Sequence, residues 1–262
     1  GKLQQAGKVT KVTGDIDSPE ALASLVKGCD AVIYCVGLLR EFPRKGITFE
    51  NTQYQGVVST IDAMRKSGVS RLALMSAIGV KDPGTAYQST KFRAEEYALG
   101  SGLDVTVLRP SVIFGDPRGT MEFATQLHRD MVKPPLPGVA FPGVRMSPVS
   151  VTDVADAFVS ALHDDGTIGR RYELAGPEIL SWREILKRVA DAVDRSKLVL
   201  RMPLGVMRLG ATLFDWLPFY PVTRDQLTML EEGNMASPAD LQGLIGRDAR
   251  PMTPAALAYL RR

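Results

Sequence analysis

The stretch from Ser76 to Gly115 decides the fold of this chain. It follows the apolar run Arg71-Leu-Ala-Leu-Met-Ser76, contains Tyr87-Gln-Ser-Thr-Lys91, and closes with Val105-Thr-Val-Leu-Arg-Pro110-Ser-Val-Ile-Phe-Gly115. The two apolar runs have the length and composition of strands, and a helical pattern begins at Tyr87. The order strand, loop, helix, strand, loop predicts an α/β fold built on a parallel sheet.

The spacing within this stretch also predicts a chemistry. Tyr87 and Lys91 are four residues apart, so a helix places both on one face. A phenol has an unperturbed pKa of about 10, and a neighbouring ammonium lowers that pKa by stabilising the phenolate. Ser76, at the carboxyl end of the preceding strand, is positioned to hydrogen-bond the same substrate oxygen. These three side chains are the candidate catalytic set for a proton transfer coupled to a cofactor's hydride.

Composition places the chain among ordinary globular proteins. It has 262 residues, of which 45% are hydrophobic and 23% are charged, and a net charge of +3. That charge is too small to indicate nucleic-acid binding, and no Lys/Arg cluster with interleaved aromatic residues occurs. The two histidines and two cysteines lack metal-ligand spacing, so no metal site is predicted.

Cys29 and Cys35 flank one predicted strand, residues 30–37. We interpret them as buried free thiols in a reducing compartment, which favours a cytoplasmic protein. A strand at 8–12 and a helix starting at Ser18 come before this strand, because Ser18-Pro19-Glu20 combines a cap, a first-turn proline and an acid. Strand 30–37 is apolar throughout, which is typical of a strand buried on both faces of a parallel sheet.

The central stretch resembles the active segment of the short-chain dehydrogenase/reductase superfamily in its extended branch, whose members include NAD-dependent epimerases and dehydratases. Leu108-Arg-Pro-Ser-Val-Ile-Phe-Gly115 is similar to the loop that passes the nicotinamide there. The resemblance implies a Rossmann-like, doubly wound parallel sheet with a smaller C-terminal substrate-binding lobe. It implies a dinucleotide-binding domain over 1–118 and a mainly helical lobe over 119–262, of which 147–176 return partly to the main sheet.

The resemblance also implies a cofactor, NADP or NAD, and the residues that hold it. An Asp followed by an aliphatic residue contacts the adenine, and a glycine after the next strand lets the backbone approach the ribose and phosphates. Tyr87 and Lys91 face the nicotinamide end. The implied cofactor-binding residues are Asp15, Ile16, Cys35, Val36, Gly37, Asn51, Tyr87, Lys91, Pro110, Ser111 and Val112.

A dinucleotide site of this class needs a first strand and a Gly-rich turn that opens a helix. No Gly-x-x-Gly-x-x-Gly occurs in this sequence. A βαβ unit needs at least about 30 residues. We therefore expect a unit of that size to precede this sequence in the natural protein, with its strands between those at 8–12 and 30–37.

The last third carries a narrower resemblance. Residues 175–177, 217–227 and 252–262 are similar to the alpha-subcomplex subunit nine family of respiratory complex I and its bacterial relatives. That family implies a tightly held NADPH and contact with a membrane complex near its quinone end. The apolar stretch 198–222 includes a predicted helix over 204–217 and is the candidate contact with a membrane surface or a respiratory complex. The expected location is cytoplasmic, peripheral to the inner membrane, or the mitochondrial matrix in a eukaryote.

Three functions follow from these patterns. The first is an oxidoreductase acting on an apolar carbonyl or a quinone-like molecule, since the loops 38–48 and 133–143 are rich in Leu, Phe, Pro and Val. The second is a non-catalytic scaffold that holds the nucleotide without consuming it. The third is a sugar-nucleotide epimerase or dehydratase, for which no additional Glu or Cys lies beside the Tyr-Lys pair. The sequence leaves open whether the Ser-Tyr-Lys set turns over.

Overall fold

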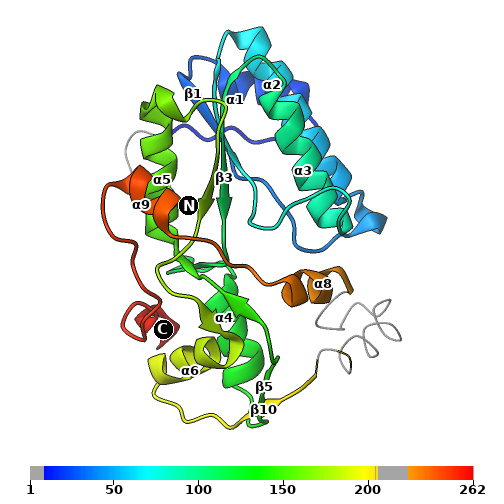
Figure 1. The fold of residues 1–262 in the computed structure, drawn as a ribbon. Helices are drawn as coiled ribbons and strands as arrows, with labels where there is room; N and C mark the ends of the chain where they lie inside the picture. Colours follow the sequence, from blue (N-terminus) through cyan, green and yellow to red (C-terminus); the bar gives the residue numbers. More distant parts are fainter. Residues whose placement is uncertain (1–8, 204, 206–223, 262) are drawn as a thin grey trace.

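The computed structural model describes residues 9–203, 205 and 224–261. Its centre is a parallel sheet in the order β1 (Ala31–Tyr34), β2 (Arg71–Met75), β3 (Asp104–Pro110) and β8 (Arg171–Leu174). Helices α1 (Pro19–Val26), α2 (Gly56–Ser67) and α3 (Ala86–Leu99) lie on one side of this sheet, and α5 (Val151–His163) and α9 (Ala239–Ile245) on the other (Figure 1). The predicted doubly wound α/β fold is therefore confirmed.

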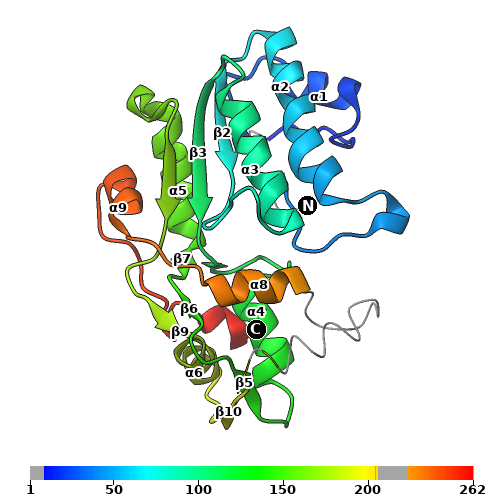
Figure 2. The same ribbon diagram turned by 45° about the vertical axis from the view of Figure 1, so that its right-hand side comes forward.

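A smaller lobe lies below the sheet (Figures 1 and 2). It contains α4 (Phe123–Leu127), α6 (Trp182–Ala192) and the parallel pair β5 (Gly138–Ala140) and β10 (Val199–Arg201). We call the sheet with its helices the upper lobe and this part the lower lobe. The remaining elements are β4 (Ile113–Phe114) with β7 (Val149–Ser150), β6 (Arg145–Met146) with β9 (Leu180–Ser181), and helix α8 (Arg224–Glu232), which lies between the lobes.

Short helical turns complete the chain. Two of them are π-helical turns that extend predicted helices: Glu50–Gln55 precedes α2, and His128–Val132 follows α4. Three others are 3₁₀ turns, at Pro43–Lys45, Asp165–Thr167 and Ala258–Arg261.

The local signals for helix ends act as the sequence predicts. The Ser18 side chain accepts a hydrogen bond from Ala21 N, and α1 stops just before Gly28, which has φ +73°. Ser181 and Glu184 form a reciprocal capping box at the start of α6. These bonds satisfy backbone groups that a helix end leaves without an internal partner.

The central place of β2 in the sheet explains why its sequence is apolar at every position after Arg71. Leu72 and Leu74 pack into the core beneath α2 and α3, whereas Ala73 packs with the residues of α5 on the other face. All three are at most 2% exposed. Burial on both faces is the ordinary state of a central parallel strand.

The predictions for the first strands were wrong in part. Residues 9–12 form no strand, and β1 is the edge of the sheet, with Ile33 45% exposed. A strand needs a hydrogen-bonding neighbour, and no described segment forms strand pairs with 9–12 or with the outer edge of β1. The same edge position explains why both cysteines are exposed, although buried thiols were predicted.

Two further helix predictions have different outcomes. The predicted last helix, residues 253–260, is a series of turns closed by i→i+3 bonds and a 3₁₀ turn. The predicted helix over 204–217 falls almost wholly outside the described residues. Within the described part of the chain, no helix is long and apolar enough to cross a bilayer.

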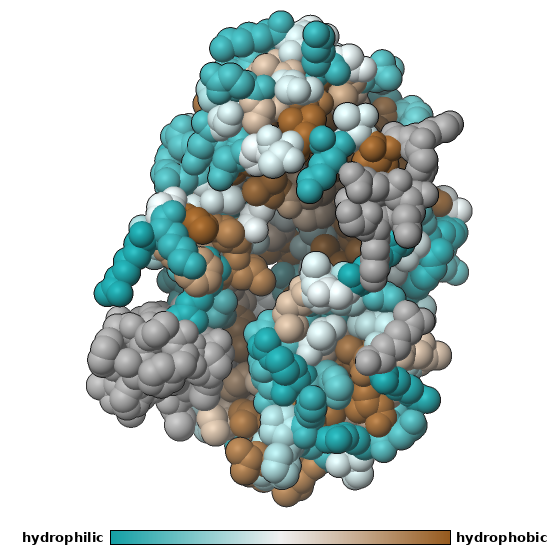
Figure 3. Space-filling view, turned by 180° about the vertical axis from the view of Figure 1, so that it is seen from behind, coloured by the Kyte–Doolittle hydropathy of each residue, from teal (hydrophilic) through white to brown (hydrophobic). Residues whose placement is uncertain are grey.

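The surface is hollowed between the upper and lower lobes. The view from behind shows this hollow, with hydrophobic residues on its floor (Figure 3). It lies below the sheet, toward the lower lobe, where the carboxyl ends of the parallel strands point. In open α/β sheets, ligands bind in a crevice outside those ends.

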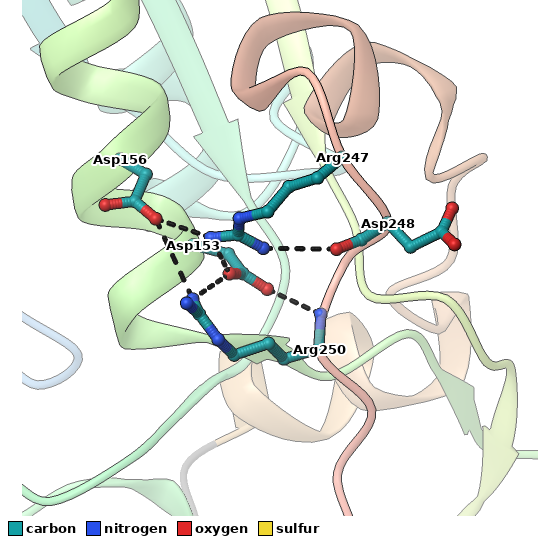
Figure 4. Close-up of polar contacts among 5 residues, drawn as sticks. All are labelled: Asp153, Asp156, Arg247, Asp248 and Arg250. Atoms are coloured by element: carbon teal, nitrogen blue, oxygen red, sulfur yellow. Dashed lines mark hydrogen bonds and ion pairs between the residues drawn. The ribbon is translucent and has the colours of Figure 1, made fainter.

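An ion cluster around the buried Asp153 attaches the C-terminal segment to the upper lobe. Asp153, on α5, is fully buried and accepts hydrogen bonds from Arg247 Nη2 at 2.8 Å and Arg250 N at 2.7 Å, and it also contacts Arg250 Nη1 (Figure 4). Asp156 accepts a bond from Arg247 Nη2 at 2.5 Å. Charge pairing and hydrogen bonding together compensate the cost of burying the Asp153 carboxylate.

Candidate active site

The carboxyl ends of β1, β2 and β3 bring the candidate residues to one edge of the sheet. Gly37 follows β1, Ser76 follows β2 and Ser111 follows β3. Backbone bonds hold the loops in register, because Ser76 N donates to Leu108 O at 2.8 Å and Ile78 N donates to Pro110 O at 3.2 Å. The loop after β2 and the loop after β3 therefore run side by side.

Ser76 carries a buried hydroxyl with no protein partner. The residue is 4% exposed, and its Oγ has no hydrogen-bond partner among the described residues. A buried hydroxyl without a partner costs free energy unless a ligand or water pairs with it. Its place at a strand's carboxyl end makes it a candidate to bind a ligand oxygen.

Tyr87 lies in the first turn of α3. A capping box between Thr85 and Gln88 fixes that turn. The Tyr87 ring meets the ring of Phe49 edge to face, with centroids 5.7 Å apart. Burial raises the pKa of the Tyr87 phenol to about 12, so the phenol is protonated at neutral pH.

Lys91 is one turn further along α3 and is only 6% exposed. Its Nζ donates to Met75 O at 3.0 Å, and a Cβ added at Gly37 would lie 3.2 Å from the same nitrogen. Burial lowers the pKa of the Lys91 ammonium to about 8, against the opposing influence of Cys35 and Glu95. An ammonium has three donors, so Lys91 can make further bonds to a ligand passing Gly37.

This geometry differs from the simplest expectation for the pair. We expected Lys91 to lower the Tyr87 pKa, yet the ammonium contacts Met75 O and burial raises the pKa of the phenol. The buried lysine donates a hydrogen bond to the carbonyl oxygen of Met75, at the end of β2. The other two donors of the ammonium can pair with a ligand that offers oxygen atoms.

A buried carboxylate lies behind Lys91 on the same helix. Glu95 is fully buried, and its oxygens accept bonds from Arg109 Nε at 2.9 Å and Arg109 Nη2 at 2.5 Å. Arg171, on β8, adds a third bond at 3.0 Å. This network joins α3 to β3 and β8 and so fixes the helix that carries Tyr87 and Lys91.

The other residues implied by the resemblance make contacts of their own. Asp15 Oδ1 accepts a bond from Ile16 N at 2.7 Å. The Ile16 side chain packs against Gly56, where an added Cβ would lie 2.7 Å from Ile16 Cδ1. Asn51 Nδ2 donates to Gly46 O at 3.0 Å and so holds the 38–48 loop. Asp15 and Asn51 are exposed, and Cys35 and Val36 are exposed after β1.

The loop after β3 lies next to the loop that carries Ser76. Pro110 and Ser111 are buried, and Ser111 N donates to Leu174 O at 3.0 Å. Val112 is half-buried and packs against the core of the lower lobe. Ser111 Oγ donates to Asn234 O at 3.3 Å, which brings a distant segment to the site.

That distant segment, the end of α8 and the residues after it, was not found by sequence reasoning. Glu232 accepts bonds from Gln88 Nε2 at 2.7 Å and Lys81 Nζ at 2.5 Å, directly beside Tyr87. Asn234 Oδ1 and Ser147 Oγ are buried without partners among the described residues. No local pattern marks these residues, because the contacts join positions more than 30 residues apart.

Taken together, the parallel sheet, the glycine after β1 and the buried Ser-Lys pair define a nucleotide-binding protein of the doubly wound α/β class. A family model described as NAD(P)H-binding matches residues 1–165. The chain therefore belongs to this NAD(P)H-binding family.

Known proteins agree with this assignment. The chain is 25% identical over 236 residues to subunit 9 of the NADH dehydrogenase [ubiquinone] 1 alpha subcomplex from Arabidopsis thaliana, covering 87% of this chain and 57% of the relative. It is 25% identical to a ceramide reductase from Caulobacter vibrioides, covering 80% and 65%. It thus spans less than two thirds of the length of either relative. The predicted resemblance to the complex I subunit family is confirmed.

Solved structures confirm the fold. An NADPH-dependent quinone oxidoreductase from Escherichia coli, solved with NADPH, superposes with a TM-score of 0.73 at 15% identity, covering 100% of this chain and 87% of that one. At this identity the likeness concerns the fold alone.

The residues present fit the nicotinamide end of a dinucleotide. Ser76 offers an unpaired hydroxyl, Lys91 has unused donors, and Gly37 lets the backbone approach Lys91, since an added Cβ would lie 3.2 Å from Lys91 Nζ. Lys91 would hold the ribose, Tyr87 would lie beside it at the nicotinamide end, and the backbone at Pro110–Val112 would face the nicotinamide. Bound there, the cofactor supplies or accepts a hydride.

Proposed function

We propose that this protein is an NAD(P)-dependent oxidoreductase that acts on an apolar carbonyl or quinone-like compound. The observation that carries this proposal is the juxtaposition of an unpaired buried hydroxyl, Ser76, with the buried Lys91 ammonium at the end of β2. Tyr87 is the proton donor or acceptor at the substrate oxygen, and Ser76 donates a hydrogen bond to the same oxygen. Lys91 holds the ribose and, once released from Met75 O, stabilises the Tyr87 phenolate.

The names of known proteins support the substrate class. The similar proteins include a ceramide reductase and, among solved structures, a quinone oxidoreductase. Exposed apolar side chains also occur on the 38–48 loop, where Leu39 is 65% and Phe42 is 50% exposed. Both features favour a substrate with an apolar body and a reactive oxygen.

Purification without added nucleotide tests whether the protein binds a dinucleotide and consumes it. The protein is prepared without added nucleotide and denatured, and any released dinucleotide is identified. The reduced cofactor is then offered to the native protein with a panel of aldehydes and quinones. We expect release of NADP or NAD and oxidation of the reduced form by at least one member of the panel.

A scaffold function is the second candidate, and one observation favours it. The Tyr87 phenol has a raised pKa and the Lys91 ammonium contacts a main-chain carbonyl, so the catalytic pair is not assembled in this structure. Under this alternative the nucleotide co-purifies and stays unconsumed through the whole panel. The relation to complex I subunits is consistent with such a role.

We further propose that the protein associates peripherally with a membrane or a membrane complex through residues 198–222. The apolar composition of this stretch supports the proposal. In a bacterial cell the protein would then lie at the cytoplasmic side of the inner membrane, and in a eukaryote at the matrix side.

The cofactor role of Lys91 predicts a pH dependence. The Lys91 ammonium loses its proton as the pH rises through its pKa of about 8, and only the charged form donates strongly to a ribose. We expect the affinity for NADPH to be constant well below that pH and to fall above it. Fluorescence titration of NADPH at pH values on both sides of the pKa measures this midpoint.

Lys91→Arg provides the control for this titration. A guanidinium stays charged throughout the range, so the variant should bind more weakly but without the midpoint. A variant that keeps the same midpoint would assign the titration to another group.

A further inference from the structure

The tip of the lower lobe combines exposed apolar side chains with cations. It is built from two segments, residues 131–138 and 195–203, which β5 and β10 hold side by side. Leu136, Leu198 and Leu200 are 70%, 67% and 51% exposed. We call this surface the β5/β10 tip; it lies at the end of the molecule opposite α1 and α2 (Figure 1).

The charge of the β5/β10 tip has one sign. Its two segments contain Lys133, Arg195, Lys197 and Arg201 and no Asp or Glu. None of the four cations forms an ion pair with a carboxylate in the described part of the chain. Burial lowers the pKa of the nearby His128, and the positive charges of Arg195 and Lys133 lower it further.

Hydrogen bonds join the two segments of the β5/β10 tip. Arg195 Nη1 donates to Lys133 O at 2.9 Å, and Lys197 Nζ donates to Val132 O at 3.1 Å and contacts Pro134 O. These bonds join the two segments and leave a cavity of about 300 Å³ between them, whose lining includes Leu136, Leu198 and three prolines. A preformed surface loses little conformational entropy on binding.

We propose that the β5/β10 tip is a docking surface for an anionic lipid bilayer. The cations match the negative headgroups, and the three leucines and the prolines can enter the boundary between headgroups and acyl chains. A stable protein partner would need roughly 800 Å² on each side, and three leucines on a narrow tip offer much less apolar area. The proposal deepens the membrane association proposed above and rests on it, since it assigns that contact to named residues.

Vesicle co-sedimentation of the full chain tests the proposal. One set of vesicles is phosphatidylcholine alone, and in the other about one third of the lipid is phosphatidylglycerol. We expect binding to the anionic vesicles that weakens as salt is added, and little binding to the neutral ones. The double variant Lys133→Glu/Arg201→Glu should weaken binding at least about tenfold, since each surface cation contributes about fivefold.

A second variant and a matched control make the result specific. Leu136→Ser/Leu198→Ser removes the apolar part without touching a buried residue and should also weaken binding. The control is Leu25→Ser/Lys66→Glu, which changes an exposed leucine and an exposed lysine on α1 and α2. It should bind like the unchanged protein.

The remaining outcomes overturn the proposal in different ways. Equal binding by both tip variants and the control would show that another segment meets the membrane. Equal binding to neutral and anionic vesicles would exclude recognition of charge. No binding to either vesicle would leave a protein partner as the occupant of this surface. NADPH binding, measured on the same samples, is expected to be unchanged in every variant, so a failure here is distinguishable from a failure of the cofactor proposal.

Discussion

Replacing Tyr87 with Phe is expected to lower turnover by about 10²–10⁴-fold while leaving NADPH affinity nearly intact. The change removes only the hydroxyl that exchanges a proton with the substrate oxygen. The ring keeps its edge-to-face contact with Phe49, so the first turn of α3 should stay in place. Oxidation of NADPH by the most active member of the aldehyde and quinone panel measures the first quantity, and fluorescence titration measures the second.

The same helix offers a matched control. Tyr97 also lies on α3 and packs edge to face against Tyr54, ten residues beyond Tyr87 and away from the carboxyl ends of the strands. Tyr97→Phe should retain full turnover. If Tyr87→Phe turns over as fast as Tyr97→Phe, the assignment of the proton-transferring residue is wrong.

Gly176→Ala is expected to destabilise the folded protein by more than about 3 kcal/mol, or to prevent folding. A Cβ at this position would lie 1.8 Å from Pro148 O and 2.8 Å from Pro148 C. The obstacle is backbone, so no side chain can rotate away to make room. The segment after β8 would have to separate from Ser147, whose carbonyl oxygen accepts a bond from Gly176 N at 3.1 Å.

Gly243→Ala separates this steric effect from the general effect of replacing glycine. Gly243 lies within α9, and a Cβ there meets nothing within 4 Å. Removing a glycine from a helix interior should stabilise the protein by about 1 kcal/mol. Urea denaturation of both variants measures the two changes, and similar midpoints for both would contradict the close approach at Gly176.

The segment from β2 to β3 could be predicted because its signals are local. The apolar run ending at Ser76, the spacing of Tyr87 and Lys91, and the capping residues are all readable within a few positions. The state of each strand in the sheet could not be predicted in the same way. The apolar sequence of β1 indicated burial on both faces, but burial depends on the neighbouring strand, and β1 is an edge.

Contacts at the candidate site show the same division. Sequence spacing placed Lys91 on the same helix face as Tyr87, yet it could not show that the ammonium would reach Met75 O. Glu232 meets Gln88 across 144 positions, and no periodicity links them. Electrostatic environment and long-range contacts depend on the packed chain and are therefore read only from the structure.

The C-terminal segment has a mechanical consequence. Its Arg247 and Arg250 form ion pairs with Asp153 in the upper lobe. Met252 O accepts a bond from Arg188 at 2.9 Å in the lower lobe. Further on, Tyr259 Oη accepts a bond from Gly115 N at 3.2 Å and donates to Glu122 at 3.0 Å. The segment thus connects the two lobes and restrains their separation. Separation of the two lobes to widen the hollow would break these ion pairs and hydrogen bonds.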